Sequence, residues 1–146
     1  MMTMYHYTEC GLRNVWLTNG FTVRDFNGQK AVSISDADQL HRVIGRAVAT
    51  KPYLTGTELR FLRKELGLSQ KRLADLVGST EQTVSLWERR GRMPKGYDRL
   101  IRLFYLEMID GNVKIQEMIN RLIELDRNQT EKLIFSDTDS GWKMAA

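Results

Sequence analysis

The chain has 146 residues, of which 42% are hydrophobic and 27% are charged, as in a soluble globular protein with one ordinary domain or two small ones. No apolar stretch approaches the roughly 20 residues that a membrane span requires, and the first ten residues lack the features of a signal peptide. The single cysteine, Cys10, excludes an internal disulfide, so we expect a cytoplasmic protein.

The net charge of +4 is unevenly distributed. Residues 51–105 carry twelve basic and six acidic side chains, whereas residues 106–146 carry five basic and eight acidic ones. Such a block can be an ordinary solvated face. It can equally bind a polyanion, because each cation placed on a phosphate releases condensed counterions.

The first fifty residues carry the signals of a small α+β unit. A short apolar run at 15–17 predicts a strand, and the runs 21–26 and 31–34 flank Asn27-Gly28, the dipeptide preferred in tight hairpin turns. A helix should follow, because Ser35 can cap it and apolar residues then recur at helical spacing. These residues are Leu40, Val43, Ile44, Ala47 and Val48. An isolated hairpin is marginal in water, so the strands should pack on this helix.

The segment 51–54 should end that helix, because the residue before Pro52 disfavours the α region. We therefore expect a boundary here, with 1–50 as the small unit and 51–128 as an all-α domain of five helices. The polar residues 129–146 should form a flexible tail. The predicted fold class is α+β.

The five helices are marked by capping residues. Thr55 and Glu58 form a capping box, in which the hydroxyl and the carboxylate each accept from the other residue's amide. Glycines are suited to end helices because they tolerate a positive φ. The expected start and stop signals are Thr55 and Gly67, Ser69 and Gly78, Thr80 and Gly91, then Pro94 and the turn 110–112, which precedes a fifth helix ending near residue 125.

The second and third of these helices should cross at a tight turn. Ala74 is small where the third helix approaches, and Val77, Val84 and Trp87 should fill the space between helices. The residues left facing outward are Glu81, Gln82, Ser85 and Leu86. An amide pairs with adenine, a carboxylate accepts from cytosine, and an aliphatic side chain contacts the thymine methyl group, so this face suits DNA bases.

The run LRKELGLSQKRLADLVGSTEQTVSLWERRGRMP resembles the Cro/cI-type helix-turn-helix of the XRE family. The resemblance implies a lambda-repressor-like DNA-binding domain whose third helix enters the major groove of double-stranded DNA. It implies base contacts from Glu81, Gln82 and Leu86, with Ser85 on the same face. Leu86 departs from the polar residue often found there. It also implies contacts to the DNA backbone from Gln70, Lys71, Ser79, Thr80, Thr83, Arg89, Arg90, Arg92 and Lys95.

The order of a hairpin-rich unit before this motif resembles the MqsA (YgiT-type) antitoxins, whose N-terminal unit is a zinc finger with two Cys-x-x-Cys pairs. Here Tyr7 stands in place of the first cysteine of one pair, Cys10 remains, and the segment 32–35 has no thiol. Four ligands are needed for structural zinc, so we expect no metal. Apolar packing should replace it, by Trp16, Phe21, Phe26, Val32 and Ile34, and Cys10 should be a core or turn residue.

No catalytic residues or cofactors are expected. Cys10, His6 and His41 could supply a nucleophile and a base, but neither histidine has an orienting motif nearby. We therefore predict a repressor that reads a palindromic operator as a homodimer through contacts in 97–125. The alternative is an antitoxin of a type II system, in which residues 1–49 bind a toxin protein. A third possibility is an interaction adaptor that has lost DNA binding.

Overall fold

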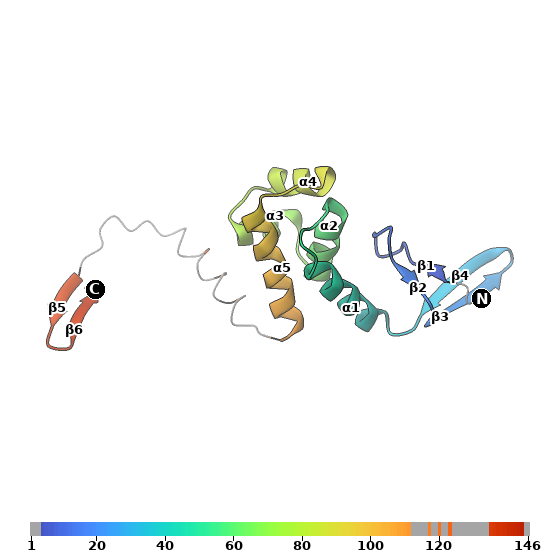
Figure 1. Ribbon diagram of the computed structural model, residues 1–146, viewed down its shortest axis with the longest axis horizontal. Coiled ribbons are helices and arrows are strands. Elements are labelled where there is room, and N and C mark those ends of the chain that lie inside the picture. Colours follow the sequence, from blue (N-terminus) through green and yellow to red (C-terminus); the bar gives the residue numbers. More distant parts are fainter. Residues whose placement is uncertain (1–3, 112–116, 118–119, 121–122, 124–134, 145–146) are drawn as a thin grey trace.

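The computed structural model describes residues 4–111, 117, 120, 123 and 135–144. Paired strands come first, helices follow, and a further hairpin ends the described chain, so the class is α+β as predicted (Figure 1). The elements are β1 Tyr5–His6, β2 Trp16–Leu17, β3 Phe21–Phe26, β4 Gln29–Ile34, α1 Ala37–Ala49, α2 Gly56–Glu65, α3 Gln70–Val77, α4 Glu81–Arg90, α5 Lys95–Ile109, β5 Phe135–Thr138 and β6 Gly141–Met144.

The predicted hairpin around Asn27-Gly28 is confirmed. Strands β3 and β4 pair antiparallel, with Phe21 opposite Ile34 and Val23 opposite Val32. Asn27 and Gly28 both have positive φ, at 51° and 84°, as the two central residues of a type I′ turn require. Strands β1 and β2 form a separate antiparallel pair, so the N-terminal unit consists of two small ribbons.

The cap of α1 is Asp36, so the assignment of Ser35 as the cap was wrong by one residue. The Asp36 carboxylate accepts from the Gln39 amide at 3.3 Å. Ser35 instead donates its amide to the carbonyl of Gly20 at 2.8 Å and closes the base of the β3–β4 hairpin. The tight connection places Asp36 in the left-handed region, with φ of 44°, which Asp tolerates better than most side chains.

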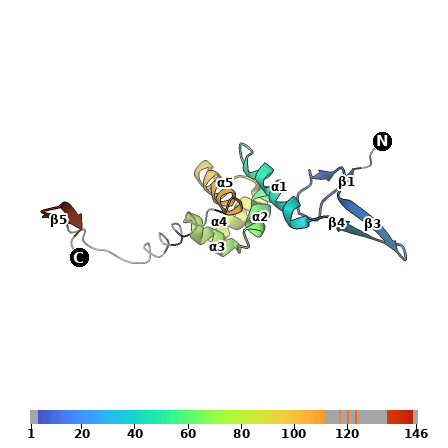
Figure 2. The same cartoon turned by 90° about the horizontal axis from the view of Figure 1, so that it is seen from below.

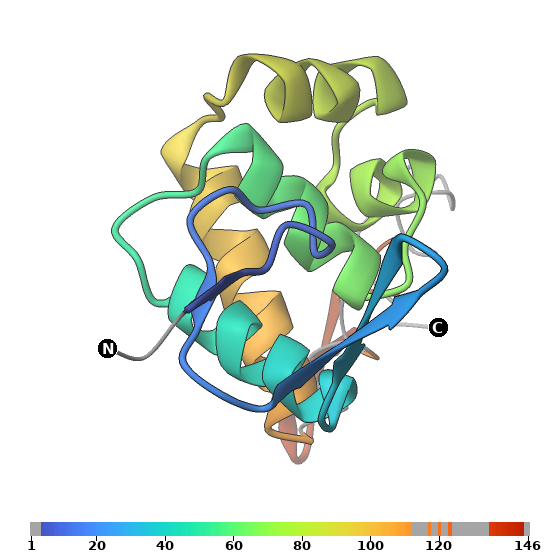
Figure 3. The same ribbon diagram turned by 90° about the vertical axis from the view of Figure 1, so that its right-hand side faces the viewer.

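Helix α1 packs with the helices that follow it in the chain. It contacts α2 and α5, and the end view in Figure 3 shows it lying against them. One hydrophobic core joins Tyr7 and Leu12 of the strand region, Ile44 and Val48 of α1, and the buried residues of α2 to α5. The division at 51–54 stays a prediction, but the core continues across it.

The aromatic packing expected for the N-terminal unit is only partly present. Trp16 and Phe26 remain 54% and 60% exposed, so the expectation that they build a core was wrong. Trp16 stacks on His6, with ring centroids 4.0 Å apart. Phe21 contacts Tyr5 and is partly buried. Figure 2 shows the β3–β4 hairpin projecting from the helices, which leaves its outer part without a covering layer.

The segment 51–54 is held to α5 by hydrogen bonds. Arg102 donates to the carbonyl of Lys51 at 2.6 Å and to the carboxylate of Asp98 at 2.6 Å. The buried Asp98 in turn accepts from the Leu54 amide at 2.7 Å. Charge-assisted bonds to backbone groups are stronger than neutral ones. The connection from α1 to α2 is therefore fixed at both of its ends.

The helix starts and stops from α2 to α5 follow the predicted signals. The capping box of Thr55 and Glu58 is present, and Ser69 and Thr80 accept from the amides three residues later. Gly78 and Gly91 end their helices with φ of 75° and 76°. Val84 and Trp87 are buried as expected, whereas Val77 is only half-buried and Leu76 lies in the interior.

The C-terminal residues differ from the expected tail. Residues 135–144 form the antiparallel hairpin β5–β6, in which Phe135 and Trp142 are exposed. The predicted fifth helix near 112–125 lies almost entirely outside the described residues. No helix among the described segments has the length and apolarity needed to cross a membrane.

Helices α2 and α4 approach so closely that Gly56 has no room for a side chain. A Cβ at this position would overlap the carbonyl oxygen of Glu88 and would lie 2.8 Å from its carbonyl carbon. The backbone contact at Gly56 limits the distance between the axes of α2 and α4. Gly45 of α1 leaves room for a side chain instead, because a Cβ there would overlap the hydroxyl of Tyr105 from α5.

We predict that Gly56→Ala destabilises the protein by about 3 kcal/mol, because the added methyl group forces α2 away from the backbone of α4. Urea unfolding would measure the change. Gly96→Ala is the matched control, since Gly96 is exposed on α5 with no atom within 4 Å of an added Cβ. Equal effects of the two substitutions would contradict the close crossing.

The buried hydroxyl of Tyr105 has no hydrogen-bond partner within the described part of the chain, and burial raises its pKa to about 12. Tyr105→Phe should therefore leave stability at pH 7 unchanged or raise it by up to about 1 kcal/mol. The pKa of Tyr105 is higher in the folded state than in the unfolded state. Its contribution to the free energy of unfolding is therefore complete below pH 10 and is lost as the pH rises through 12. Urea titrations at pH 7 and 11 should show a smaller alkaline loss in the variant, and an equal loss would contradict the assignment.

Candidate nucleic-acid interface

The outer face of α4 holds the four residues expected to read bases. Glu81 and Gln82 in its first turn are exposed, whereas Ser85 and Leu86 one turn later are half-buried. The helix is anchored from below by Val84 and Trp87, and Trp87 packs on the ring of Tyr97 with centroids 5.0 Å apart. The face expected to enter the groove is therefore open at its first turn and partly enclosed at its second.

The hydroxyl groups before and within α4 are occupied by capping. Thr80 accepts from the Thr83 amide at 3.2 Å, and the two hydroxyls lie 2.8 Å apart. Ser79 is half-buried, and its amide donates to the carbonyl of Ala74 at 2.8 Å. These residues fix the turn between α3 and α4, and their predicted backbone contacts with DNA stay a prediction.

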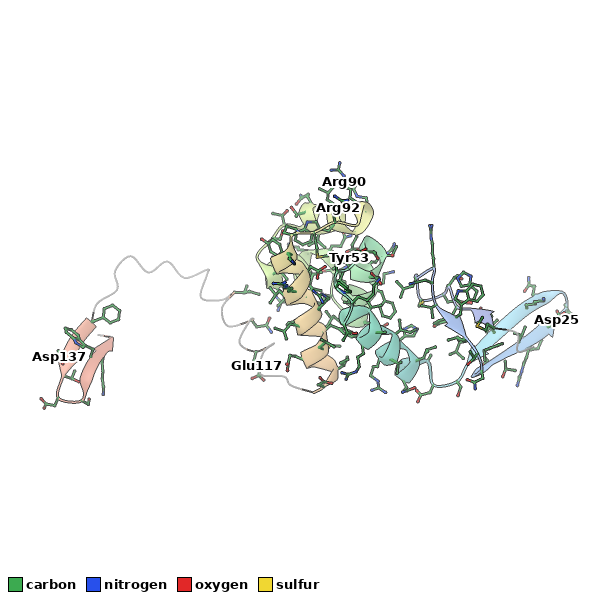
Figure 4. The ribbon with its side chains drawn as sticks, viewed as in Figure 1. Asp25, Tyr53, Arg90, Arg92, Glu117 and Asp137 are labelled. Atoms are coloured by element: carbon green, nitrogen blue, oxygen red, sulfur yellow. The ribbon has the colours of Figure 1, made fainter. Side chains whose placement is uncertain are left out.

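A group of exposed cations follows α4. Figure 4 shows Arg90 and Arg92 extending away from the helices at the end of α4. Arg89 and Lys95 are exposed as well, on α4 and at the start of α5. At the start of α3, Lys71 is exposed and Gln70 is half-buried. Gln70 and Arg89 line the same cleft beside α4, so the structure brings these two predicted phosphate contacts together.

A nearly buried ion pair holds α4 against α2. Arg63 donates to both carboxylate oxygens of Glu88, at 2.8 and 3.1 Å, and to the carbonyl of Leu68 at 2.9 Å. The side chains of Arg63 and Glu88 are only 12% and 6% exposed. Glu88 is therefore the structural partner of a basic side chain, Arg63. The pair ties α4 both to α2 and to the α2–α3 turn.

Arg60 and Thr57 of α2 belong to the same surface and were missed by the sequence analysis. They line a cleft between α2 and α4 together with Arg63, Gln70, Ser85, Glu88 and Arg89. Only helical spacing within α2 connects Thr57 with Arg60, and nothing in the sequence indicates that this face lies beside α4. The contact arises from the crossing angle of the two helices.

A second polar cluster connects the N-terminal unit to the helices. The two ring nitrogens of His41 lie 2.7 Å from the Tyr7 hydroxyl and 2.8 Å from a carboxylate oxygen of Glu65. Cys10 lies nearby in the same hollow, in a turn, and its thiol donates to the carbonyl of Tyr7 at 3.5 Å. Both nitrogens of His41 are engaged, so the cluster is a structural tie between Tyr7, just after β1, and helices α1 and α2.

The described residues contain no group of three or more His, Cys, Asp or Glu side chains arranged to hold a metal ion. Tyr7 stands where the zinc-finger antitoxins have the first cysteine of a Cys-x-x-Cys pair, and its side chain is buried in the core. The resemblance of residues 1–50 to that antitoxin family stays a prediction.

Comparison with known proteins identifies the central part of the chain. Residues 59–98, from the middle of α2 to the start of α5, match the family model described as helix-turn-helix. This segment is therefore similar to a family whose members bind DNA. Neither curated proteins nor solved structures gave a match.

We predict that Glu88→Ala destabilises the helix-turn-helix by about 3–5 kcal/mol, because it leaves the guanidinium of Arg63 nearly buried without its counter-charge. Chemical unfolding would measure the loss. The double variant Arg63→Met with Glu88→Leu should recover most of it, since it removes both charges and keeps apolar volume. A double variant as unstable as Glu88→Ala would show that the volume of the site, and not its unpaired charge, determines the loss.

Proposed function

We propose that the protein is a sequence-specific transcriptional regulator that inserts α4 into the major groove of DNA and represses its target genes. The observation that carries this proposal is the open first turn of α4. Glu81 and Gln82 are exposed there within the segment that matches the helix-turn-helix model, and exposed cations lie at the end of α4 and just after it. Gln82 supplies a bidentate amide for adenine, and Glu81 a carboxylate for cytosine. Arg90, Arg92 and Lys95 supply contacts to phosphate.

We further propose that it acts as a homodimer on a palindromic operator. A single recognition helix covers only a few base pairs, which is too little for useful discrimination, so two copies related by two-fold symmetry are required. Leu103 remains exposed on α5, within the segment 97–125 where we place the dimer contact. This exposed apolar side chain supports the assignment.

A second candidate is an antitoxin that combines the same DNA binding with capture of a toxin by residues 1–49. It is favoured by Trp16, Val23 and Phe26, three large apolar side chains that are exposed on the N-terminal ribbons and could contact a protein partner. In this case a purified toxin encoded by a neighbouring gene should bind the wild-type chain and not a Trp16→Ala, Phe26→Ala variant.

The test is binding-site selection from random DNA, followed by affinity measurements on the best site. Wild-type protein should select two related half-sites about 10 base pairs apart, centre to centre. Gln82→Ala should weaken binding by about 1–3 kcal/mol and relax the preference at one base pair in each half-site. Arg92→Ala should weaken binding to all DNA sequences by a similar factor.

Gln39→Ala is the matched control, because it makes the same change at an exposed position on α1. If Gln82→Ala binds the best site as tightly as the control does, the groove assignment is wrong. If wild-type protein selects nothing at low salt, the chain is an interaction adaptor and not a DNA-binding regulator.

A further inference from the structure

The cleft between α2 and α4 is open to solvent and lined by hydrogen-bond donors. Helix α2 contributes Thr57 and Arg60, α3 contributes Gln70 at its first residue, and α4 contributes Ser85 and Arg89. It lies directly beside the predicted base-reading face, because Ser85 belongs to both. A molecule that follows the outer face of α4 meets this cleft at its edge.

The charge of the cleft is positive in spite of the carboxylate within it. Glu88 is fully engaged by Arg63, so this pair contributes no net charge. Arg60 and Arg89 are exposed, and neither takes part in an ion pair among the described residues. Arg89 makes one long contact, from its Nε to the carbonyl of Ser85 at 3.4 Å. Two uncompensated guanidinium groups therefore border the cleft.

The position of Arg60 relative to α4 is fixed by the scaffold. Gly56, one turn earlier on α2, lies against the backbone of α4, and Arg63, one turn later, binds Glu88. With both turns attached to α4, only the side chain of Arg60 has to be ordered when an anion binds. A site built in this way loses little conformational entropy on binding.

We propose that this cleft holds a phosphate of the DNA backbone at the border of the groove that α4 reads, with Arg60 as its main cation. Gln70 and Arg89 complete the site from the other two helices. The inference rests on the proposed DNA-binding function and adds Arg60, on the first helix of the motif, to the residues that carry it. Charge complementarity and continuity with the face of α4 identify the occupant as the sugar–phosphate backbone.

The test compares Arg60→Gln with Arg42→Gln on the operator selected by the wild type. Arg42 is an exposed arginine on α1, which lies on the other side of the helices from α4 (Figure 1), so the control makes the same change in net charge. Fluorescence anisotropy between 50 and 300 mM salt should show the Arg60→Gln slope of log K against log salt reduced by about one, with affinity roughly tenfold lower at 100 mM.

Arg60→Gln should leave the base preference unchanged, Arg42→Gln should match the wild type in both slope and affinity, and Arg60→Lys should recover most of the slope. Thermal unfolding of each variant would show that the helices remain folded. An Arg60→Gln slope equal to that of Arg42→Gln overturns the cleft assignment and leaves the proposed function intact. Failure of the wild type to bind any DNA overturns both.

Discussion

The junction of α2 with α4 determines the geometry of the surface for which we propose DNA binding. Two constraints act two turns apart on α2: the missing side chain of Gly56 lets the backbones touch, and the Arg63–Glu88 pair fixes the rotation of α4 about its axis. Distance alone would leave α4 free to turn. The bidentate ion pair between Arg63 and Glu88 removes that freedom. Arg63 also donates to the carbonyl of Leu68, which attaches the turn before α3 to the same guanidinium group.

This pair also shapes the surface electrostatics. Replacing a buried ion pair by apolar residues is often neutral for stability, so its value lies in the arrangement it specifies. By engaging Glu88, Arg63 removes the one carboxylate that would otherwise repel phosphate from the cleft. The remaining cations, Arg60 and Arg89, then act without a competing partner among the described ion pairs. Structural order and surface charge are set by the same contact.

The sequence predicted most of the features that local chemistry determines, although the cap of α1 is Asp36 and not Ser35. Caps at Thr55, Ser69 and Thr80 and the turn at Asn27-Gly28 depend on neighbouring residues, and all were placed correctly. Features that depend on distant contacts were missed or misplaced. They are the exposure of Trp16 and Phe26, the packing of α1 into the helical core, the β5–β6 hairpin, and the cleft at Arg60.

The hydrogen bonds of Arg102 with the segment 51–54 affect how the N-terminal strands are positioned relative to α4. Lys51 and Leu54 are both attached to α5, and His41 joins Tyr7, the residue just after β1, to α2. The chain beside β1 is therefore held in a set position relative to the helices. A partner bound there would affect DNA binding by α4 through its bulk alone, by steric exclusion of the duplex, without any refolding of α4.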